Sequence, residues 1–433
     1  MSSKIKGYLK FFVKVYIVAK IRSWLISVFG DAVNKNGWED RILLVHLEGL
    51  GDSVALTSVL KYYQEDIPGK EVYMLVDKAS SFDDPAVFGG AIQRLVWIDY
   101  RRFVKNPFYG LHFINELRKI GFKKVVTHDP SLAEISGKFI MTGLCAEDVV
   151  GYDGALFQRV TPFDENMRRS IAYVRKNLFP RFTEIAESAD KDFDFRIQKP
   201  LNYILHFIKS YEKFSGRSHT DYSPEIFAPA GAEVSILKIL EKNSISPGNY
   251  CLLSLSTSTP KREWPAERFA KVLLKFKNQS LPLVIAGGRR DAYLTERFQK
   301  IYGDGFLNLA GKTSISEYIA LVKNSFFSLS NETAQAHIAI ALKKPSLAIL
   351  GGGHFGLLSL YGYADINRWL YRNDINCLYD NWRCVHSVGP NEPAPCIDII
   401  TENDVAKELG SLINYLSKEK NYPREPFKIG FEV

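Results

Sequence analysis

The chain has 433 residues, 46% hydrophobic and 24% charged, a composition typical of a soluble globular protein, and it contains no low-complexity tract. Its length exceeds what one hydrophobic core usually organises, so we expect two domains. Lys and Arg (56) outnumber Asp and Glu (48), and the formal net charge of +8 favours an anionic partner: phosphate, a lipid surface or nucleic acid. Nucleic acid has only this charge in its favour, because no module of interleaved aromatic and basic residues accompanies it.

The first 30 residues are basic, contain no acid and are rich in large apolar side chains. Lys6, Lys10 and Lys14 recur every four residues, which places them on one face of a helix. Charges interrupt the segment too often for it to span a bilayer, which takes roughly 20 apolar residues. We predict that residues 1–40 form a basic amphipathic segment whose residues 1–30 lie on an anionic membrane; the alternative is a helix packed on the protein with its lysines extended into solvent.

The cysteines are few and scattered, and no secretory leader precedes them. The predicted location is therefore cytoplasmic, on the inner face of the cytoplasmic membrane if the N-terminal segment binds lipid.

From residue 41 onward, short apolar runs alternate with helix-length segments, which is typical of an α/β domain with a parallel sheet. In the first part, strands are predicted at residues 41–46, 71–76, 94–98 and 124–127, with a helix at 53–64. After a polar, Pro-containing stretch the pattern restarts, with strands predicted at 250–254, 281–286, 326–330 and 346–350. The predicted domains are residues 41–230 and 231–410, two doubly wound Rossmann-like units facing a cleft, with 411–433 packing back on the first unit.

The first predicted strand leads into LEGLGDS at residues 47–53. Gly49 and Gly51 allow a tight turn and close approach of a ligand, toward which the N–H groups of the next helix would point. The complete dinucleotide fingerprint and the Lys-Ser/Thr ending of a phosphate loop are both missing, so the segment indicates neither an NAD site nor a phosphate-loop NTPase. Asp52 is a candidate general base, or only the cap of the helix.

A second strand-to-helix segment, TSTPKREWPAERF, occupies residues 257–269. The hydroxyls of Thr257 and Ser258 and the cations of Lys261 and Arg262 could neutralise a departing diphosphate, although a solvated basic turn would have the same composition. A third segment, SNETAQAHIAIALKKP at residues 330–345, begins another helix, at whose N-terminus a phosphate or a sugar hydroxyl could bind.

These segments occur in the order and approximate spacing of glycosyltransferase family 9, the heptosyltransferases, which the chain resembles over roughly residues 41–410. The family pattern is an L-G-D turn, then K-x-W-P, G-K-T-S and N-D-T/S-G-x-x-H. Its counterparts here are LGD at residues 50–52, KREWP at 261–265, GKTS at 311–314 and NETAQAH at 331–337.

The resemblance implies a GT-B architecture, with an acceptor domain followed by a nucleotide-sugar donor domain. It implies that Asp52 is the base toward the acceptor hydroxyl and that Lys261 contacts the donor diphosphate. Thr333 and the neighbouring backbone N–H groups would contact phosphate. His337 matches the family histidine, and a structural role for it is equally open.

Three departures from the family pattern bear on the donor. Glu332 stands where the family has Asp, and Ala334 stands where it has Gly. The loop GGGHFG at residues 351–356, with Gly352 and His354, replaces the usual G-P-T. We expect this loop, like Gly287 after an earlier strand, to face the donor.

Cys377, Cys384, His386 and Cys396 resemble a cysteine-rich segment found in many family members. Three thiols and one imidazole could complete a tetrahedral metal site. Unligated thiols are the alternative, and our prediction is that no metal is required.

The function implied is an inverting glycosyltransferase that uses ADP-heptose or a related nucleotide sugar, needs no cofactor, and acts on a glycolipid or glycan of the bacterial surface. The alternative is a catalytically silent nucleotide-sugar binder or membrane-associated scaffold with the same fold. A Rossmann-type oxidoreductase is opposed by the missing fingerprint.

Overall fold

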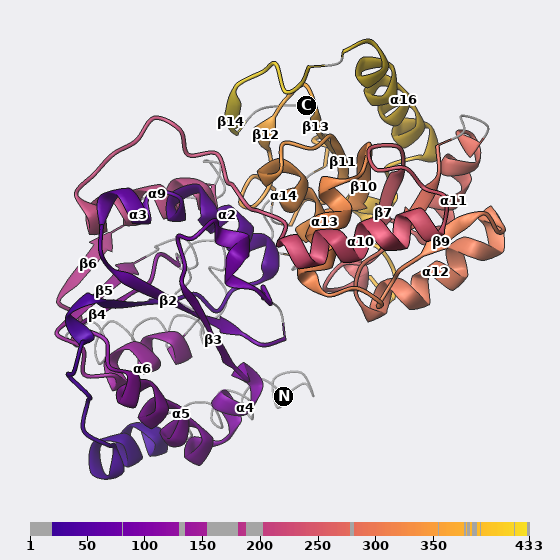
Figure 1. Cartoon of the computed structure of the whole chain (residues 1–433). Coiled ribbons are helices and arrows are strands. Elements are labelled where there is room, and N and C mark those ends of the chain that lie inside the picture. Colours follow the sequence, from indigo (N-terminus) through magenta and orange to yellow (C-terminus); the bar gives the residue numbers. More distant parts are fainter. Residues whose placement is uncertain are drawn as a thin grey trace.

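The computed structural model describes residues 20–79, 81–129, 135–153, 181–187, 202–277, 281–353, 355–375, 378, 382, 388–389, 391–419 and 421–430. Two six-stranded sheets lie side by side, one in each half of the chain (Figure 1). Their strand orders are β3-β2-β1-β4-β5-β6 and β13-β11-β10-β7-β8-β9, and every pairing within them is parallel. Counted within each half, both have the doubly wound order with the first strand near the middle. The predicted fold class is confirmed.

The first sheet is built from the strands β1 (Arg41–Val45), β2 (Glu71–Asp77), β3 (Arg94–Ile98), β4 (Lys124–Val126), β5 (Asp148–Asp153) and β6 (Glu184–Glu187). The helices of this half are α2 (Leu50–Leu60), α3 (Tyr63–Asp66), α4 (Tyr100–Lys105), α5 (Pro107–Ile120), α6 (Ile135–Gly143) and α9 (Tyr203–Ser215). Residues 20–29 form a further helix.

The second sheet is built from the strands β7 (Cys251–Ser254), β8 (Leu283–Ile285), β9 (Phe306–Asn308), β10 (Phe327–Asn331), β11 (Ser346–Ile349) and β13 (Asn367–Leu370), and β12 (Tyr361–Tyr363) pairs separately with β14 (Phe427–Ile429). The helices are α10 (Ala230–Lys242), the 3-10 turn η4 (Pro260–Arg262), α11 (Ala266–Leu274), α12 (Arg289–Tyr302), α13 (Ile315–Lys323), α14 (Ala334–Ala341), α15 (Pro395–Asp398) and α16 (Glu402–Lys418).

All eight predicted strands are present, with ends shifted by up to two residues. Of the strands that were not predicted, β6, β9 and β13 lie at sheet edges, β5 lies inside the first sheet, and β12 and β14 form the separate two-stranded sheet. An edge strand has only one neighbour and is less completely buried, so it does not need the continuous apolar run that marks a central strand. The helix predicted at residues 53–64 begins three residues earlier, at Leu50, and is divided into α2 and α3.

The C-terminal segment packs differently from our prediction. We expected residues 411–433 to pack on the first half. Instead, α16 packs against α11, and β14 pairs antiparallel with β12. Tyr415 on α16 also donates a hydrogen bond to Asp365 of the second half, at 2.9 Å. The apolar stripe of α16, with Val405, Leu409 and Leu412 buried, belongs to the same hydrophobic cluster as Phe269 and Ala270 of α11.

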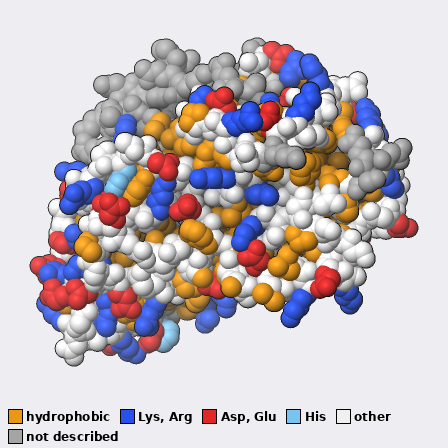
Figure 2. Space-filling model, turned by 45° about the horizontal axis from the view of Figure 1, so that its top comes forward, with side chains coloured by type: hydrophobic (Ala, Val, Ile, Leu, Met, Phe, Trp, Pro, Cys, Tyr) orange, Lys and Arg blue, Asp and Glu red, His pale blue; other side chains and the backbone are white. Residues whose placement is uncertain are grey.

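The two halves share buried apolar contacts. Helix α2 of the first half packs against α14 of the second, and α9 packs back on α2. One hydrophobic cluster contains Leu56 of α2 together with Ala339 of α14. On the face shown in Figure 2, basic and acidic side chains are interspersed, so the positive net charge does not gather there into one patch.

Trp264, from the KREWP segment, is a structural anchor of the second half. Its side chain is 0% exposed, its indole N–H donates to the carbonyl of Ile400 at 2.8 Å, and its ring meets Phe269 edge to face at 4.8 Å. The tryptophan of this motif therefore holds the motif loop against the turn between α15 and α16.

We expect Trp264→Ala to lower the free energy of unfolding by about 3–5 kcal/mol, because it leaves a cavity and removes the hydrogen bond to the Ile400 carbonyl. Tyr293→Ala, at a side chain 62% exposed in the same half, serves as control and should change it by less than about 0.5 kcal/mol. Chemical denaturation measures both. Equal effects would mean that Trp264 is not an anchor.

Candidate functional site

The carboxyl ends of the two sheets face a shared cleft of about 490 Å³. Residues from the turn after β1, from the loops after β7 and β8, and from the first turn of α14 line it. Open α/β sheets bind ligands at this edge, because the turns between strand and helix converge there. The cleft is therefore where the geometry places a ligand.

On the side of the first half, the cleft wall is the first turn of α2. Gly49 is the N-cap of this helix, and Asp52 follows in its first turn. Burial raises the pKa of Asp52 to about 6, opposed by the positive charges of His46 and Arg262 and assisted by the negative charge of Asp129. A carboxylate with such a pKa is half protonated at mildly acidic pH and can act as a base at neutral pH.

Across the cleft, Arg262 of η4 is the cation that reaches the lining. Its guanidinium forms an ion pair with Glu332 at 3.1 Å and lies over the Trp382 ring at 5.2 Å. Glu332 is 3% exposed, and burial raises the pKa of its carboxyl while Arg262 lowers it. Asp52, Arg262 and Glu332 thus bring two acids and one cation into the same pocket.

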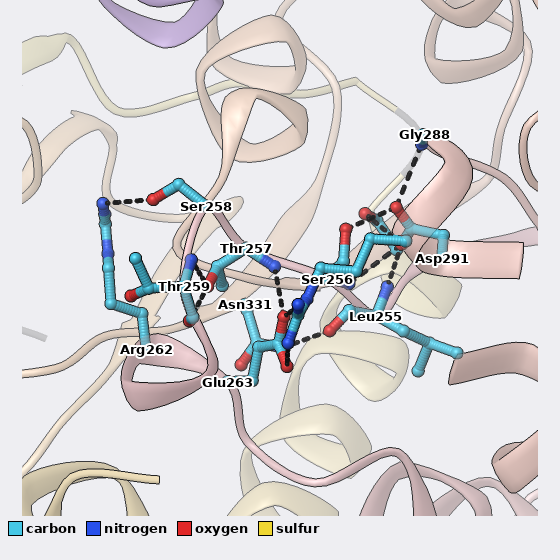
Figure 3. A network of polar contacts seen from close by, with 12 residues as sticks. Leu255, Ser256, Thr257, Ser258, Thr259, Arg262, Glu263, Gly288, Asp291 and Asn331 are labelled. Atoms are coloured by element: carbon cyan, nitrogen blue, oxygen red, sulfur yellow. Dashed lines mark hydrogen bonds and ion pairs between the residues drawn. The ribbon is translucent and has the colours of Figure 1, made fainter. Parts of the chain in front are cut away.

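On the side of the second half, one buried carboxylate, Asp291 in the first turn of α12, organises the cleft wall (Figure 3). One of its oxygens accepts from the N–H groups of Leu255 and Ser256, at 2.7 and 2.9 Å, and from the Ser254 hydroxyl at 3.2 Å. The other accepts from the Ser256 hydroxyl at 2.5 Å and the N–H of Gly288 at 3.0 Å. Asp291 therefore fastens the loop after β7 to the loop after β8.

A second carboxylate, Glu263, holds in place the loop at residues 257–265, which carries Lys261 and Arg262. It accepts from the N–H of Thr257 at 3.1 Å and from two nitrogens of Arg290, at 2.5 and 2.9 Å (Figure 3). Asn331 at the end of β10 accepts from the N–H of Trp264 at 2.7 Å and donates to the carbonyl of Leu255 at 2.7 Å. These bonds preorganise the loop that carries Arg262.

The N-terminus of α14 opens into the cleft, with Thr333 as N-cap. Its hydroxyl accepts from the N–H of Gln335 at 3.3 Å. The positive end of a helix dipole favours an anion at this position. Ala334 lines the cleft, so its methyl group occupies space that a glycine would leave open.

His337 connects the two halves. Its imidazole is buried and hydrogen-bonded through Nδ1 to the Tyr361 hydroxyl, and burial lowers its pKa to about 3, which keeps the ring neutral. A Cβ added at Gly51 would lie 2.7 Å from the His337 ring. Gly51 is therefore small because the imidazole of the other half packs directly on it.

Most of the predicted site residues meet in this cleft. The lining includes Gly49, Gly51, Asp52, Thr257, Ser258, Arg262, Gly287, Glu332, Thr333, Ala334 and His337. Lys261 and Gly352 do not line it, although the backbone carbonyl of Lys261 accepts a hydrogen bond from the N–H of Ala394 at 2.9 Å. His354 lies outside the described residues.

Our predictions missed Asp291, Tyr318 and Gln335, all of which line the cleft. Asp291 had a recognisable signal, since an acid three residues after Gly-Gly at a helix start is a capping pattern. Tyr318 donates to Gln335 at 2.5 Å inside the second half, a contact that depends on packing between α13 and α14.

Of the four predicted metal-ligand candidates, the described part of the chain contains one, Cys396. Cys377, Cys384 and His386 lie outside the described residues. Cys396 is buried, and its sulfur accepts from the N–H of Gly352 at 3.3 Å. Within the described part of the chain, no group of three or more His, Cys, Asp or Glu side chains could hold a metal ion.

Two facing Rossmann-like domains with a polar cleft between them define the GT-B class of fold. Two solved structures share it: a glycosyl transferase family 9 protein from Veillonella parvula (TM-score 0.62, 16% identity, 88% of this chain and 98% of that one) and E. coli ADP-heptose lps heptosyltransferase II (TM-score 0.60, 15% identity, 88% and 100%). At these identities the likeness shows the fold.

The family comparison agrees with the fold. Residues 206–382 match the model of glycosyltransferase family 9 (heptosyltransferase). A curated relative, lipooligosaccharide heptosyltransferase 2 of Haemophilus influenzae, is 24% identical over 135 residues, which cover 30% of this chain and 39% of the relative. The resemblance to glycosyltransferase family 9 is thereby confirmed.

The contact between Gly51 and His337 predicts that the effect of Gly51→Ala on stability changes sign when the His337 ring is removed. Gly51→Ala should destabilise the protein by about 1–3 kcal/mol, because the buried ring leaves no room for a methyl group. In a His337→Ala background the same substitution should be neutral or stabilising by up to about 1 kcal/mol, because alanine is the better helix former.

A double-mutant cycle of unfolding free energies measures this coupling. An equal cost of Gly51→Ala in both backgrounds would contradict the contact.

Proposed function

We propose that the chain is an inverting glycosyltransferase that moves a sugar from a nucleoside-diphosphate donor to a bacterial surface-glycan acceptor. The observation that carries the proposal is the pairing, across one cleft, of a carboxylate suited to be a base with a cation and a helix N-terminus suited to a diphosphate. The family match and the heptosyltransferase names of the relatives support ADP-heptose or a related sugar nucleotide as donor.

In this mechanism, Asp52 removes the proton of the acceptor hydroxyl while that oxygen forms a bond to the anomeric carbon. The bond from this carbon to the diphosphate breaks on the opposite face, so the configuration inverts. Arg262 and the N-terminus of α14 stabilise the negative charge that develops on the diphosphate. Glu332 orients Arg262 and is positioned to accept a hydrogen bond from a sugar hydroxyl.

Arg262 takes the role that the family resemblance assigned to Lys261. The guanidinium lines the cleft and is held there by Glu332, whereas Lys261 is not part of the lining. A planar guanidinium with several donors suits bidentate contact with a diphosphate. Lys261 remains a candidate for the donor only if the loop rearranges when the donor binds.

We expect Asp52→Asn to reduce turnover by about 10²–10⁴-fold while donor affinity is retained, since only the base is lost. Donor binding is measured as a rise in melting temperature across a panel of nucleoside diphosphates and sugar nucleotides that includes ADP-heptose, and turnover as release of nucleoside diphosphate.

Full activity of Asp52→Asn would remove this residue from the mechanism. Binding of a sugar nucleotide to the wild type without transfer would favour the alternative of a catalytically silent binder, and no stabilisation by any member of the panel would reject both.

We further propose that the helix at residues 20–29 contacts an anionic membrane. Arg22 anchors its inner face, because its guanidinium donates to the carbonyl of Phe103 at 2.7 Å and lies over that ring at 4.0 Å. The outer face presents Ile21, Trp24 and Val28, and Trp24 is 58% exposed. Aromatic and aliphatic groups on an exposed helix next to a basic segment suit the interface of a lipid bilayer.

The helix would lie on the membrane surface and would not cross the bilayer. None of the helices in the described part of the chain is long and apolar enough to cross a bilayer. The basic residues 1–19 lie outside the described residues, so their contribution rests on the sequence.

Phe29 at the end of this helix is also exposed, at 57%. Replacing Trp24 and Phe29 by serine should lower the fraction of protein that sediments with anionic vesicles several-fold, because it removes apolar surface from the interface. Tyr293→Ser, at an aromatic side chain of similar exposure in the second half, is the matched control and should sediment like the wild type. Unchanged sedimentation of the double variant would contradict the proposed surface.

A further inference from the structure

A buried histidine and aspartate lie behind Asp52 and have no role in the mechanism above. His46 directly follows β1, and Asp129 lies three residues beyond β4. Since β1 and β4 are hydrogen-bonded neighbours, their carboxyl ends bring the two side chains together. The His46 Nδ1 is hydrogen-bonded to Asp129, and the two residues are 0% and 3% exposed.

The second ring nitrogen of His46 does not take part in the bond to Asp129. Its Nε2 is buried and has no hydrogen-bond partner among the described residues, while the Phe207 ring meets the imidazole edge to face at 6.3 Å. Leaving a buried polar atom unpaired is unfavourable, so such a side chain is usually kept for another reason. A pair that served only to join β1 to β4 would not need an imidazole.

The charges around His46 indicate why an imidazole is kept at this position. Burial by itself lowers the pKa of His46, but the carboxylate of Asp129, with a smaller contribution from Asp52, raises it above its ordinary value. The carboxylate of Asp129 therefore stabilises the cationic form of the imidazole. This cation in turn lowers the pKa of Asp52, which burial and Asp129 raise.

Of the other charged groups around Asp52, the acids raise its pKa and the cations lower it. Arg262 is the second cation, and Glu332 is a further acid whose carboxyl interacts with Asp52. His128 and His337 are neutral, because burial lowers the pKa of each to about 3. The remaining titratable neighbours are Glu48, Tyr203 and Tyr361. With more acids than cations nearby, an ionised Asp52 depends on each positive charge.

We propose that His46, held by Asp129, is a positioning residue that keeps Asp52 ionised and ready to accept the acceptor proton. The proton taken from the acceptor hydroxyl stays on Asp52 and leaves to solvent with the product, so His46 keeps its own proton throughout. The catalytic consequence rests on the proposed transfer reaction. The electrostatic coupling between His46 and Asp52 does not.

The test compares three variants of the full chain. His46→Gln retains a polar side chain but removes the charge, so the acid limb of kcat/KM, which requires ionised Asp52, should move up by about one pH unit. His46→Lys restores a cation and should return the limb toward its wild-type position. His219→Gln is the control, because His219 is also bonded to a carboxylate, Asp66 at 2.7 Å, but is not among the charged groups that act on Asp52.

A second readout needs no substrate. The carbon-13 signal of the Asp52 carboxyl, assigned with Asp52→Asn, reports its titration in the free protein. We expect this titration to move up by about one pH unit in His46→Gln and to remain unchanged in His219→Gln. Asp129→Asn should lower the pKa at which the His46 ring titrates, because the imidazolium loses its anionic partner.

The two readouts separate the two proposals. If the Asp52 titration moves but the wild type shows no sugar transfer, the coupling stands and the proposed reaction fails. If the wild type transfers sugar while neither the acid limb nor the Asp52 titration moves in a folded His46→Gln protein, His46 has only a structural role and the inference is overturned. If His46→Gln does not fold, the His46→Lys variant is used instead. An Asp52 pKa equal to that of the wild type supports the inference, whereas an Asp52 pKa that is higher by one pH unit overturns it.

Discussion

The packing of α2 against α14 is the contact on which the site depends. Gly51 lets the His337 ring of the second half lie directly on the first turn of α2. That approach buries Asp52 opposite Arg262 and gives its carboxyl the raised pKa that a base near neutral pH requires. Separating the halves would hydrate Asp52 and return its pKa toward the ordinary value of an aspartate.

The polar residues of the second half divide into a rigid set and an adaptable one. Asp291 and Glu263 accept several hydrogen bonds each and fasten the loop after β7 to the loop after β8 and the start of α12, which costs no reorganisation when a ligand arrives. Arg262, in contrast, is held by one ion pair to Glu332, by a long hydrogen bond of 3.4 Å to the Ser258 hydroxyl, and by its contact with Trp382. A diphosphate could compete for this guanidinium, so Arg262 is the group most ready to turn toward a donor.

The departures from the family pattern gain a physical meaning in this setting. The longer side chain of Glu332 lets its carboxylate reach Arg262 while it remains buried beside the cleft. Ala334 narrows the space in front of the α14 N-terminus. Both changes alter the wall of the cleft that the second half provides, whereas Asp52 and Gly51 of the first half match the family pattern.

The sequence by itself determined the two parallel sheets, because central strands buried on both faces leave uninterrupted apolar runs, and it determined the local motifs that line the cleft. Edge strands such as β6 and β9 left no such run. Only the tertiary structure decided that Arg262 and not Lys261 enters the cleft, that α16 packs on α11, and that His46 and Asp129 lie behind Asp52. Each of these depends on which segments distant in the chain pack together, and no periodicity or local spacing records that choice.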